Sequence, residues 1–181
     1  LNVYNWGLYI SDGSDDSVNV LSAFEDLTGI KVNYTTFDSN ESLYAKMKSG
    51  GASYDVIVPS EYMVGKMISE GMLAPLNFDN IPNFADIGEE YRGWDFDPDN
   101  TYSVPYTWGT TGIIYNSKYV DEADVTGWEL LWNEKYAGKI LMFDNSRDAF
   151  GIAEYLLGYS VNTTDSAELQ ACADKLAEQK P

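Results

Sequence analysis

The sequence predicts an α/β protein with a parallel sheet, and three features of residues 1–71 support this fold class. Strand-like and helix-like stretches alternate, and glycines follow the helical stretches as stop signals. Parallel strands need a crossover, usually a helix, so a strand–helix–strand order favours parallel pairing. Residues 54–58 (YDVIV) form a nearly continuous apolar run, which is typical of a strand buried on both faces.

The first half of the chain divides into three strands and three helices. A strand over Leu1–Tyr4 runs into a turn rich in aromatic rings, and Gly29 is expected to stop the first helix. The expected strands are 1–4, 30–37 and 54–58, and the expected helices are 18–27, 41–49 and 62–70. A looser stretch with a short helical piece at 84–91 follows.

The second half begins with a long extended stretch that contains glycines, residues 102–116. Because glycine frees the backbone, we expect this stretch to leave one lobe and enter another, although a long strand with bulges is the alternative. Beyond it we expect a short helix at 128–132 and a buried strand at 139–143. A helix should then run from the segment 144–148 to Gly158, and a last helix should cover 166–179. We therefore divide the chain into a first lobe, 1–107, and a hinge strand with the first part of a second lobe, 108–181. One clear strand cannot close a sheet, so we expect the front part of a longer protein.

The charge balance excludes some classes of partner. The chain carries 29 acidic and 11 basic residues, a net charge of −18, which repels nucleic acid and anionic lipid and attracts cations. Solubility alone is the alternative explanation. No apolar run reaches the ~18 residues that cross a bilayer. The first residues do not resemble a signal peptide, so an exported protein would be present only as its mature part.

Histidine and cysteine usage argues against an enzyme. Histidine is absent, which excludes histidine-dependent triads and zinc sites. Cys172 is the single cysteine and lies within a helical pattern, so we expect a packing role; a nucleophile on the same fold is the alternative. The acidic run 95–100 lacks the glycine of a calcium loop. We expect no metal and no cofactor.

Polar and aromatic side chains follow three expected strands. Trp6 and Tyr9 follow the first, Ser60 and Tyr62 follow the third, and 144–148 (DNSRD) follows the strand at 139–143. Ligands of open α/β sheets bind beyond the carboxyl ends of the strands, so these residues are candidate ligand contacts. The alternatives are that the rings pack under loops and that Asp144 or Ser146 merely caps a helix.

Five blocks of the sequence, in order and with similar spacing, resemble the extracytoplasmic polyamine-binding proteins of ABC transporters, the spermidine/putrescine-binding type. The blocks are residues 4–10 (YNWGLYI), 24–47, 54–67 (YDVIVPSEYMVGKM), 102–116 (YSVPYTWGTTGIIYN) and 132–165. The resemblance spans nearly the whole chain.

This resemblance implies a type II periplasmic-binding-protein-like fold, truncated here, with two lobes that close on a ligand held in the cleft. It also implies an extracytoplasmic location and a transporter permease as partner. By residue, it implies aromatic contacts from Trp6 and Tyr9, contacts from Ser60 and Tyr62, and a terminal ammonium held at the positions of Asn145 and Asp148.

Two departures from the family pattern leave alternatives open. Gly7 stands where one member of the family has threonine, and Asn145 stands where that member has aspartate. The ligand could therefore be another small cation, and a polyamine-sensing receptor would look the same in sequence. We further expect that the 181 residues alone bind polyamine weakly, and that exposed apolar surface makes them self-associate or recruit a second polypeptide.

Overall fold

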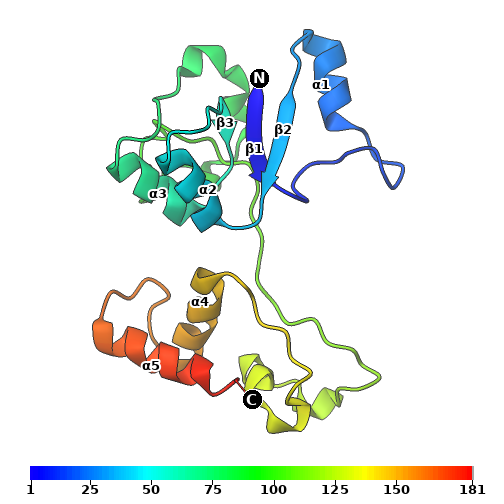
Figure 1. Cartoon of the computed structure of the whole chain (residues 1–181), viewed down its shortest axis with the longest axis vertical. Helices are drawn as coiled ribbons and strands as arrows, with labels where there is room; N and C mark the ends of the chain where they lie inside the picture. Colours follow the sequence, from blue (N-terminus) through cyan, green and yellow to red (C-terminus); the bar gives the residue numbers. More distant parts are fainter. Residues whose placement is uncertain (181) are drawn as a thin grey trace. The chain divides into compact units, whose positions relative to one another are not determined.

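The computed structural model describes residues 1–180 and divides the chain into two compact units, Leu1–Trp108 and Gly109–Pro181 (Figure 1). The first unit combines a small sheet with helices, and the second contains helices and extended segments. Among the described residues, no helix is both long and apolar enough to cross a membrane.

The first unit is built on a parallel sheet of three strands in the order β2-β1-β3. The strands are β1 (Asn2–Trp6), β2 (Asn33–Phe37) and β3 (Val56–Ile57). β1 pairs with β2 along its whole length, so that Trp6 is opposite Phe37, and it pairs with β3 at two positions. The predicted α/β class and parallel pairing are confirmed.

Three helices connect and cover these strands, close to their predicted ranges. They are α1 (Val20–Thr28), α2 (Asn40–Lys48) and α3 (Glu61–Ser69). Gly29 ends α1 in the left-handed conformation, with φ of 70°, which only glycine adopts at little cost. Ser39 caps α2, since its side chain accepts a hydrogen bond from the backbone N–H of Ser42.

The core of the first unit lies between the sheet and the helices α2 and α3. Five buried side chains form it: Tyr4, Phe37, Leu43, Met63 and Met67. The expected burial of 54–58 on both faces is wrong, because Val56 is 44% exposed. β3 is an edge strand of only two residues, and burial on both faces requires cover that this edge does not receive.

Residues 77–108 form a long connection made of short turns. Three 3-10 helices lie in it: Phe78–Asn80, Pro82–Asp86 and Glu89–Tyr91. The buried carboxylate of Asp97 accepts hydrogen bonds from the backbone N–H groups of Thr101 and Tyr102 and from the hydroxyl of Ser103. The acidic run at 95–100 is therefore organised as a turn around Asp97.

The second unit is organised around two packed helices, α4 (Ser146–Leu157) and α5 (Ser166–Ala177). The predicted helices are confirmed, and Asp165 caps α5 by accepting from two backbone N–H groups. A 3-10 helix over Trp128–Trp132 contacts α4, and two shorter 3-10 helices lie at Glu122–Asp124 and Glu134–Tyr136.

The prediction of a buried strand at 139–143 is wrong. These residues are extended but belong to no strand, and Leu141 is 97% exposed. The segment 109–116 is likewise outside any strand, and Ile114 is fully exposed. A strand needs a neighbouring backbone for its hydrogen bonds, and within the described part of the unit neither segment pairs with one.

Candidate functional site

The aromatic turn begins inside the sheet, because Trp6 is the last residue of β1. Its indole is half-buried against the ring of Phe37, at a centroid distance of 4.5 Å, and lies 6.0 Å from the ring of Tyr9. Tyr9 is 46% exposed. The core supports one indole face, and the neighbouring phenol remains open to solvent.

Three hydrogen bonds hold the backbone of this turn. Asn5, which is buried, accepts from the backbone N–H of Trp6 at 2.8 Å. The hydroxyl of Tyr34 donates to the Trp6 carbonyl at 3.4 Å, and the hydroxyl of Tyr106 donates to the Tyr9 carbonyl. The sequence reasoning did not include Asn5, Tyr34 or Tyr106, because their partners are set by the fold.

A second pair of candidates, Ser60 and Tyr62, lies where β3 passes into α3. Both are joined to the buried Asn40 of α2: its Nδ2 donates to the Ser60 hydroxyl at 3.0 Å and to the Tyr62 hydroxyl at 2.9 Å. Its Oδ1 accepts from the backbone N–H of Ser60 at 2.9 Å. The Tyr62 hydroxyl also donates to the carboxylate of Glu41 at 3.2 Å.

The two pairs lie at the same edge of the sheet. β1 and β3 are parallel neighbours, so their carboxyl ends point the same way. Trp6 and Tyr62 also pack against the same core cluster. The structure therefore brings four of the six predicted residues to one edge of the first unit, together with Asn40 and Glu41, which sequence reasoning missed.

The other two candidates, Asn145 and Asp148, lie at the start of α4 in the second unit. Asn145 caps the helix, since its Oδ1 accepts from the backbone N–H of Arg147 at 3.0 Å. The alternative that Asp144 or Ser146 caps this helix is wrong, because Asn145 provides the cap. Asp148 lies in the first turn, where the helix dipole stabilises a carboxylate. A role of either residue in ligand binding stays a prediction.

A surface ion-pair cluster of the first unit joins α2 to the end of α3. Glu70 accepts hydrogen bonds from Lys48, Lys66 and the hydroxyl of Tyr44. These donors lower the pKa of the Glu70 carboxyl to about 2, with Lys48 as the largest cause. The cluster ties the two helices together and uses two of the cations of a strongly acidic protein.

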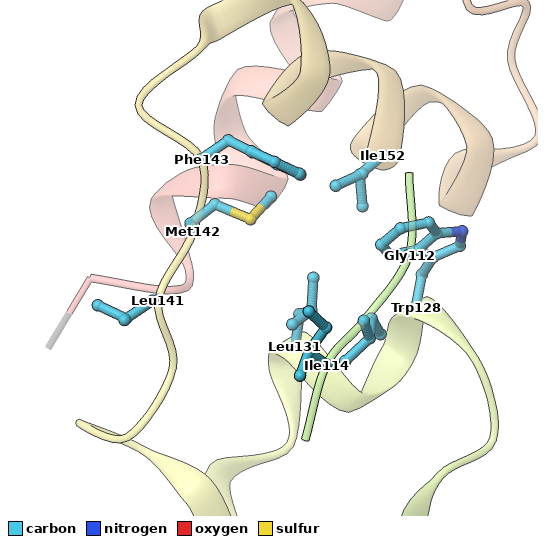
Figure 2. Close-up of a pocket in the computed structure, with 9 residues that line it drawn as sticks. Gly112, Ile114, Trp128, Leu131, Leu141, Met142, Phe143 and Ile152 are labelled. Atoms are coloured by element: carbon cyan, nitrogen blue, oxygen red, sulfur yellow. The ribbon is translucent and has the colours of Figure 1, made fainter. Parts of the chain in front are cut away.

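An apolar hollow of about 270 Å³ lies within the second unit (Figure 2). One wall is the extended segment 141–143 and another is 112–114, with Trp128, Leu131 and Ile152 beside them. None of the six predicted ligand contacts lines it. Its apolar lining does not suit a charged solute, so it is not the candidate ligand site.

The surroundings of Cys172 do not activate its thiol. Cys172 is fully buried in α5, and its burial, with the nearby Glu154 and Glu168 carboxylates, raises the pKa of the thiol. A nucleophilic cysteine needs the opposite shift. Within residues 1–180, no group of three acidic or cysteine side chains is placed to hold a metal ion.

Comparisons with known proteins identify the family. The model of the bacterial extracellular solute-binding protein family matches residues 19–181. The chain belongs to this family. The resemblance and the extracytoplasmic location expected from sequence are thereby confirmed, and a family of solute-binding proteins agrees with the prediction that the chain is not an enzyme.

Relatives and solved structures add detail to the family assignment. The chain is 41% identical over its whole length to the spermidine/putrescine-binding periplasmic protein of Escherichia coli, and 33% identical to the putrescine-binding protein SpuD of Pseudomonas aeruginosa. It covers 51% of each of these relatives. The chain therefore spans about half the length of the curated relatives that it matches.

Two solved structures confirm the fold class. The chain superposes with a TM-score of 0.90 and 41% identity on a putative spermidine/putrescine ABC transporter of Listeria monocytogenes. The superposition covers all of the chain described here and 54% of the Listeria chain. With the PotD-type lipoprotein Tp0655 of Treponema pallidum the TM-score is 0.88 at 32% identity, covering 99% of this chain and 54% of that one. The periplasmic-binding-protein fold is thus established for this family member.

Proposed function

We propose that the protein is the solute-binding component of a polyamine importer of the ABC type, with spermidine or putrescine as its ligand and a transporter permease as its partner. The observation that carries this proposal is the row of Trp6, Tyr9 and Tyr62 side chains at the carboxyl edge of β1 and β3. The names of the relatives that match the whole chain support the same class of ligand.

The chemistry of a polyamine suits this row of side chains. A polyamine alternates methylenes with ammonium groups, so a site for it needs aromatic faces and carboxylates. A cation over an aromatic face contributes about 0.5–2 kcal/mol, and a hydrogen bond between a carboxylate and an ammonium contributes about 1.5–3 kcal/mol. Trp6, Tyr9 and Tyr62 would supply faces, Ser60 a hydroxyl, and Asp148 and Asn145 an anionic and a polar contact to a terminal amine.

Calorimetry on the full-length protein tests the proposal. Spermidine and putrescine should bind, and the variant Trp6→Ala should bind about tenfold more weakly, a loss of about 1.4 kcal/mol. Trp94→Ala is the matched control, because Trp94 is a solvent-exposed tryptophan of the same unit and belongs neither to β1 and β3 nor to the turns that follow them. If the full-length protein binds neither amine, the proposal fails.

The departures at Gly7 and Asn145 support a second candidate, a binding protein for another small cationic solute. With an amide in place of a carboxylate, the second unit offers less negative charge to a terminal ammonium. Competition between spermidine and small monocations on the full-length protein separates the two ligands. Neighbouring genes for a permease and an ATPase would separate an importer component from a polyamine-sensing receptor.

We also propose that the 181-residue chain by itself binds polyamine weakly and self-associates. It spans half the length of its relatives, so contacts that complete a site can lie outside it. Its second unit exposes Ile114 and Leu141 on unpaired extended backbone beside the apolar hollow, and a second copy is the polypeptide available to cover them.

Light scattering at micromolar concentration checks the self-association. We expect a mass above that of the monomer, and we expect Leu141→Ser to shift the chain toward monomer. Leu8→Ser is the control, since Leu8 is equally exposed but lies in the first unit, outside the hollow. A clean monomer would contradict the proposed self-association. Submicromolar polyamine binding by the 181-residue chain would contradict the proposed weak binding.

A further inference from the structure

Asn40 is a fully buried amide whose hydrogen bonds all run to one neighbouring segment. It is the first residue of α2 and has no exposed surface. Its side chain bonds to the Ser60 backbone N–H, the Ser60 hydroxyl and the Tyr62 hydroxyl, at 2.9, 3.0 and 2.9 Å. Burial of an amide is unfavourable unless such bonds form, so these contacts explain why the fold tolerates an amide at position 40.

Local helix capping does not explain this amide. Ser39 already caps α2 through its own side chain, and Asn40 contributes nothing to that cap. Ser60 occupies the cap position of α3 but makes no capping bond with its side chain. The Ser60 hydroxyl instead accepts a hydrogen bond from Asn40 of α2. α3 therefore lacks a side-chain cap, and the start of α3 is linked to the start of α2.

The link fixes the hydroxyl of Tyr62 from two sides. The phenol oxygen accepts from Asn40 and donates to the carboxylate of Glu41, which is the next residue of α2. Two hydrogen bonds with opposite direction define where the oxygen lies. Because the ring also packs on the core cluster, the first turn of α2 determines the position of the phenol at the carboxyl edge of the sheet.

We propose that Asn40 is a positioning residue for solute binding: it holds Ser60 and Tyr62 in the arrangement that the ligand contacts. This inference rests on the proposed function, since it assigns Asn40 to the same edge of the first unit. A side chain that is ordered before binding loses less conformational freedom when the ligand arrives. Asn40 itself is buried and acts through its two neighbours.

A double-mutant cycle on the full-length protein tests the proposal. Asn40→Ala should weaken spermidine binding at least tenfold in the wild-type background, and only about two- to threefold in the Tyr62→Phe background, because part of its effect passes through the Tyr62 hydroxyl. Asn40→Ser is the second variant in case Asn40→Ala folds poorly; its shorter side chain cannot reach both partners, so the same pattern is expected.

Cys172→Ser is the control for a merely structural effect, because Cys172 is also fully buried but lies in α5 of the second unit. Burial of the added hydroxyl should lower the thermal midpoint and leave spermidine affinity within about twofold. The proposal is overturned if Asn40→Ala binds like wild type, if its effect adds fully to that of Tyr62→Phe, or if Cys172→Ser loses as much affinity.

Hydrogen exchange separates failure of this inference from failure of the proposed function. If the wild-type protein binds no polyamine, the proposed function fails, and the positioning role is then judged on the Ser60 amide. That amide should exchange much faster in Asn40→Ala than in Cys172→Ser. Equal exchange in the two variants would show that Asn40 does not hold this segment.

Discussion

Trp6 and Phe37 are the last paired residues of β1 and β2, and their rings pack together with centroids 4.5 Å apart. Phe37 is almost fully buried, whereas Trp6 is half-buried. The strand register thus places a core ring directly under the indole that we assign to the ligand. Phe37 therefore both stabilises the sheet and supports the Trp6 indole.

The variant Phe37→Ala should therefore affect stability and binding together. Removing a buried phenylalanine costs about 3–5 kcal/mol of unfolding free energy, and the indole of Trp6 loses its support. We expect this loss in chemical denaturation of the full-length protein, and a several-fold weaker affinity for spermidine in calorimetry at low temperature, where the variant is folded. Full affinity in a destabilised variant would show that Phe37 does not support the site.

Asp97 should be more important for stability than its position in a loop indicates. Its buried carboxylate accepts from Thr101, Tyr102 and Ser103, so Asp97→Ala leaves two backbone N–H groups without their acceptor. We expect a loss of about 2–4 kcal/mol of unfolding free energy. Asp99→Ala, at an exposed aspartate of the same turn, is the matched control and should change it by less than about 0.5 kcal/mol.

The Glu70 cluster predicts a stability change in acid. The pKa of Glu70 is lowered from 4.5 to about 2 in the folded protein, so the folded state holds its proton less tightly than the unfolded state. Its contribution to stability is therefore present above pH 4.5 and is lost as the pH falls toward 2. Glu70→Gln should be less stable than wild type at pH 6, and this difference should shrink as the pH falls. Denaturant midpoints measured across the range check it, and a constant difference would contradict it.

Cys172 should be inert in the native protein. The thiol is fully buried in α5 and its pKa is raised by burial, so both access and thiolate formation are suppressed. A thiol reagent at pH 8 should label it only after denaturant is added. Rapid labelling under native conditions would reopen the alternative of a reactive cysteine.

Asn145 offers a gain-of-function test. The resemblance noted from the sequence implies aspartate at this position, and the Asn145 side chain caps α4, a role that aspartate performs equally well. Asn145→Asp should therefore preserve folding and raise spermidine affinity several-fold by adding a carboxylate. Asp144→Asn, at the preceding exposed residue, is the control and should have little effect. No gain in Asn145→Asp would argue against a ligand contact at this position.

The sequence predicted those features that local signals determine. Gly29 and Gly158 end α1 and α4 in the left-handed conformation, and a glycine after a helical stretch is a stop signal that can be recognised from its own neighbourhood. The strand at 139–143 was predicted from composition and is not formed, because pairing depends on a backbone elsewhere. The same holds for β3. Its apolar run predicted burial on both faces, but β3 is an edge strand and Val56 is exposed.

The candidate site divides in the same way. Trp6, Tyr9, Ser60 and Tyr62 were predicted because they follow apolar strands, and the structure places these strand ends together. Asn40 was missed because its partners are 20 and 22 residues away, and its neighbours Asp38 and Ser39 form an ordinary capping sequence. Only the fold shows that this amide faces Ser60 and Tyr62.

Intermolecular nuclear Overhauser effects between bound spermidine and the full-length protein test the central claim most directly. If the polyamine binds at the carboxyl edge of β1 and β3, its methylene protons should show effects to the Trp6 indole and the Tyr62 ring, and none to Trp94. Bound spermidine that contacts neither Trp6 nor Tyr62 would contradict the account.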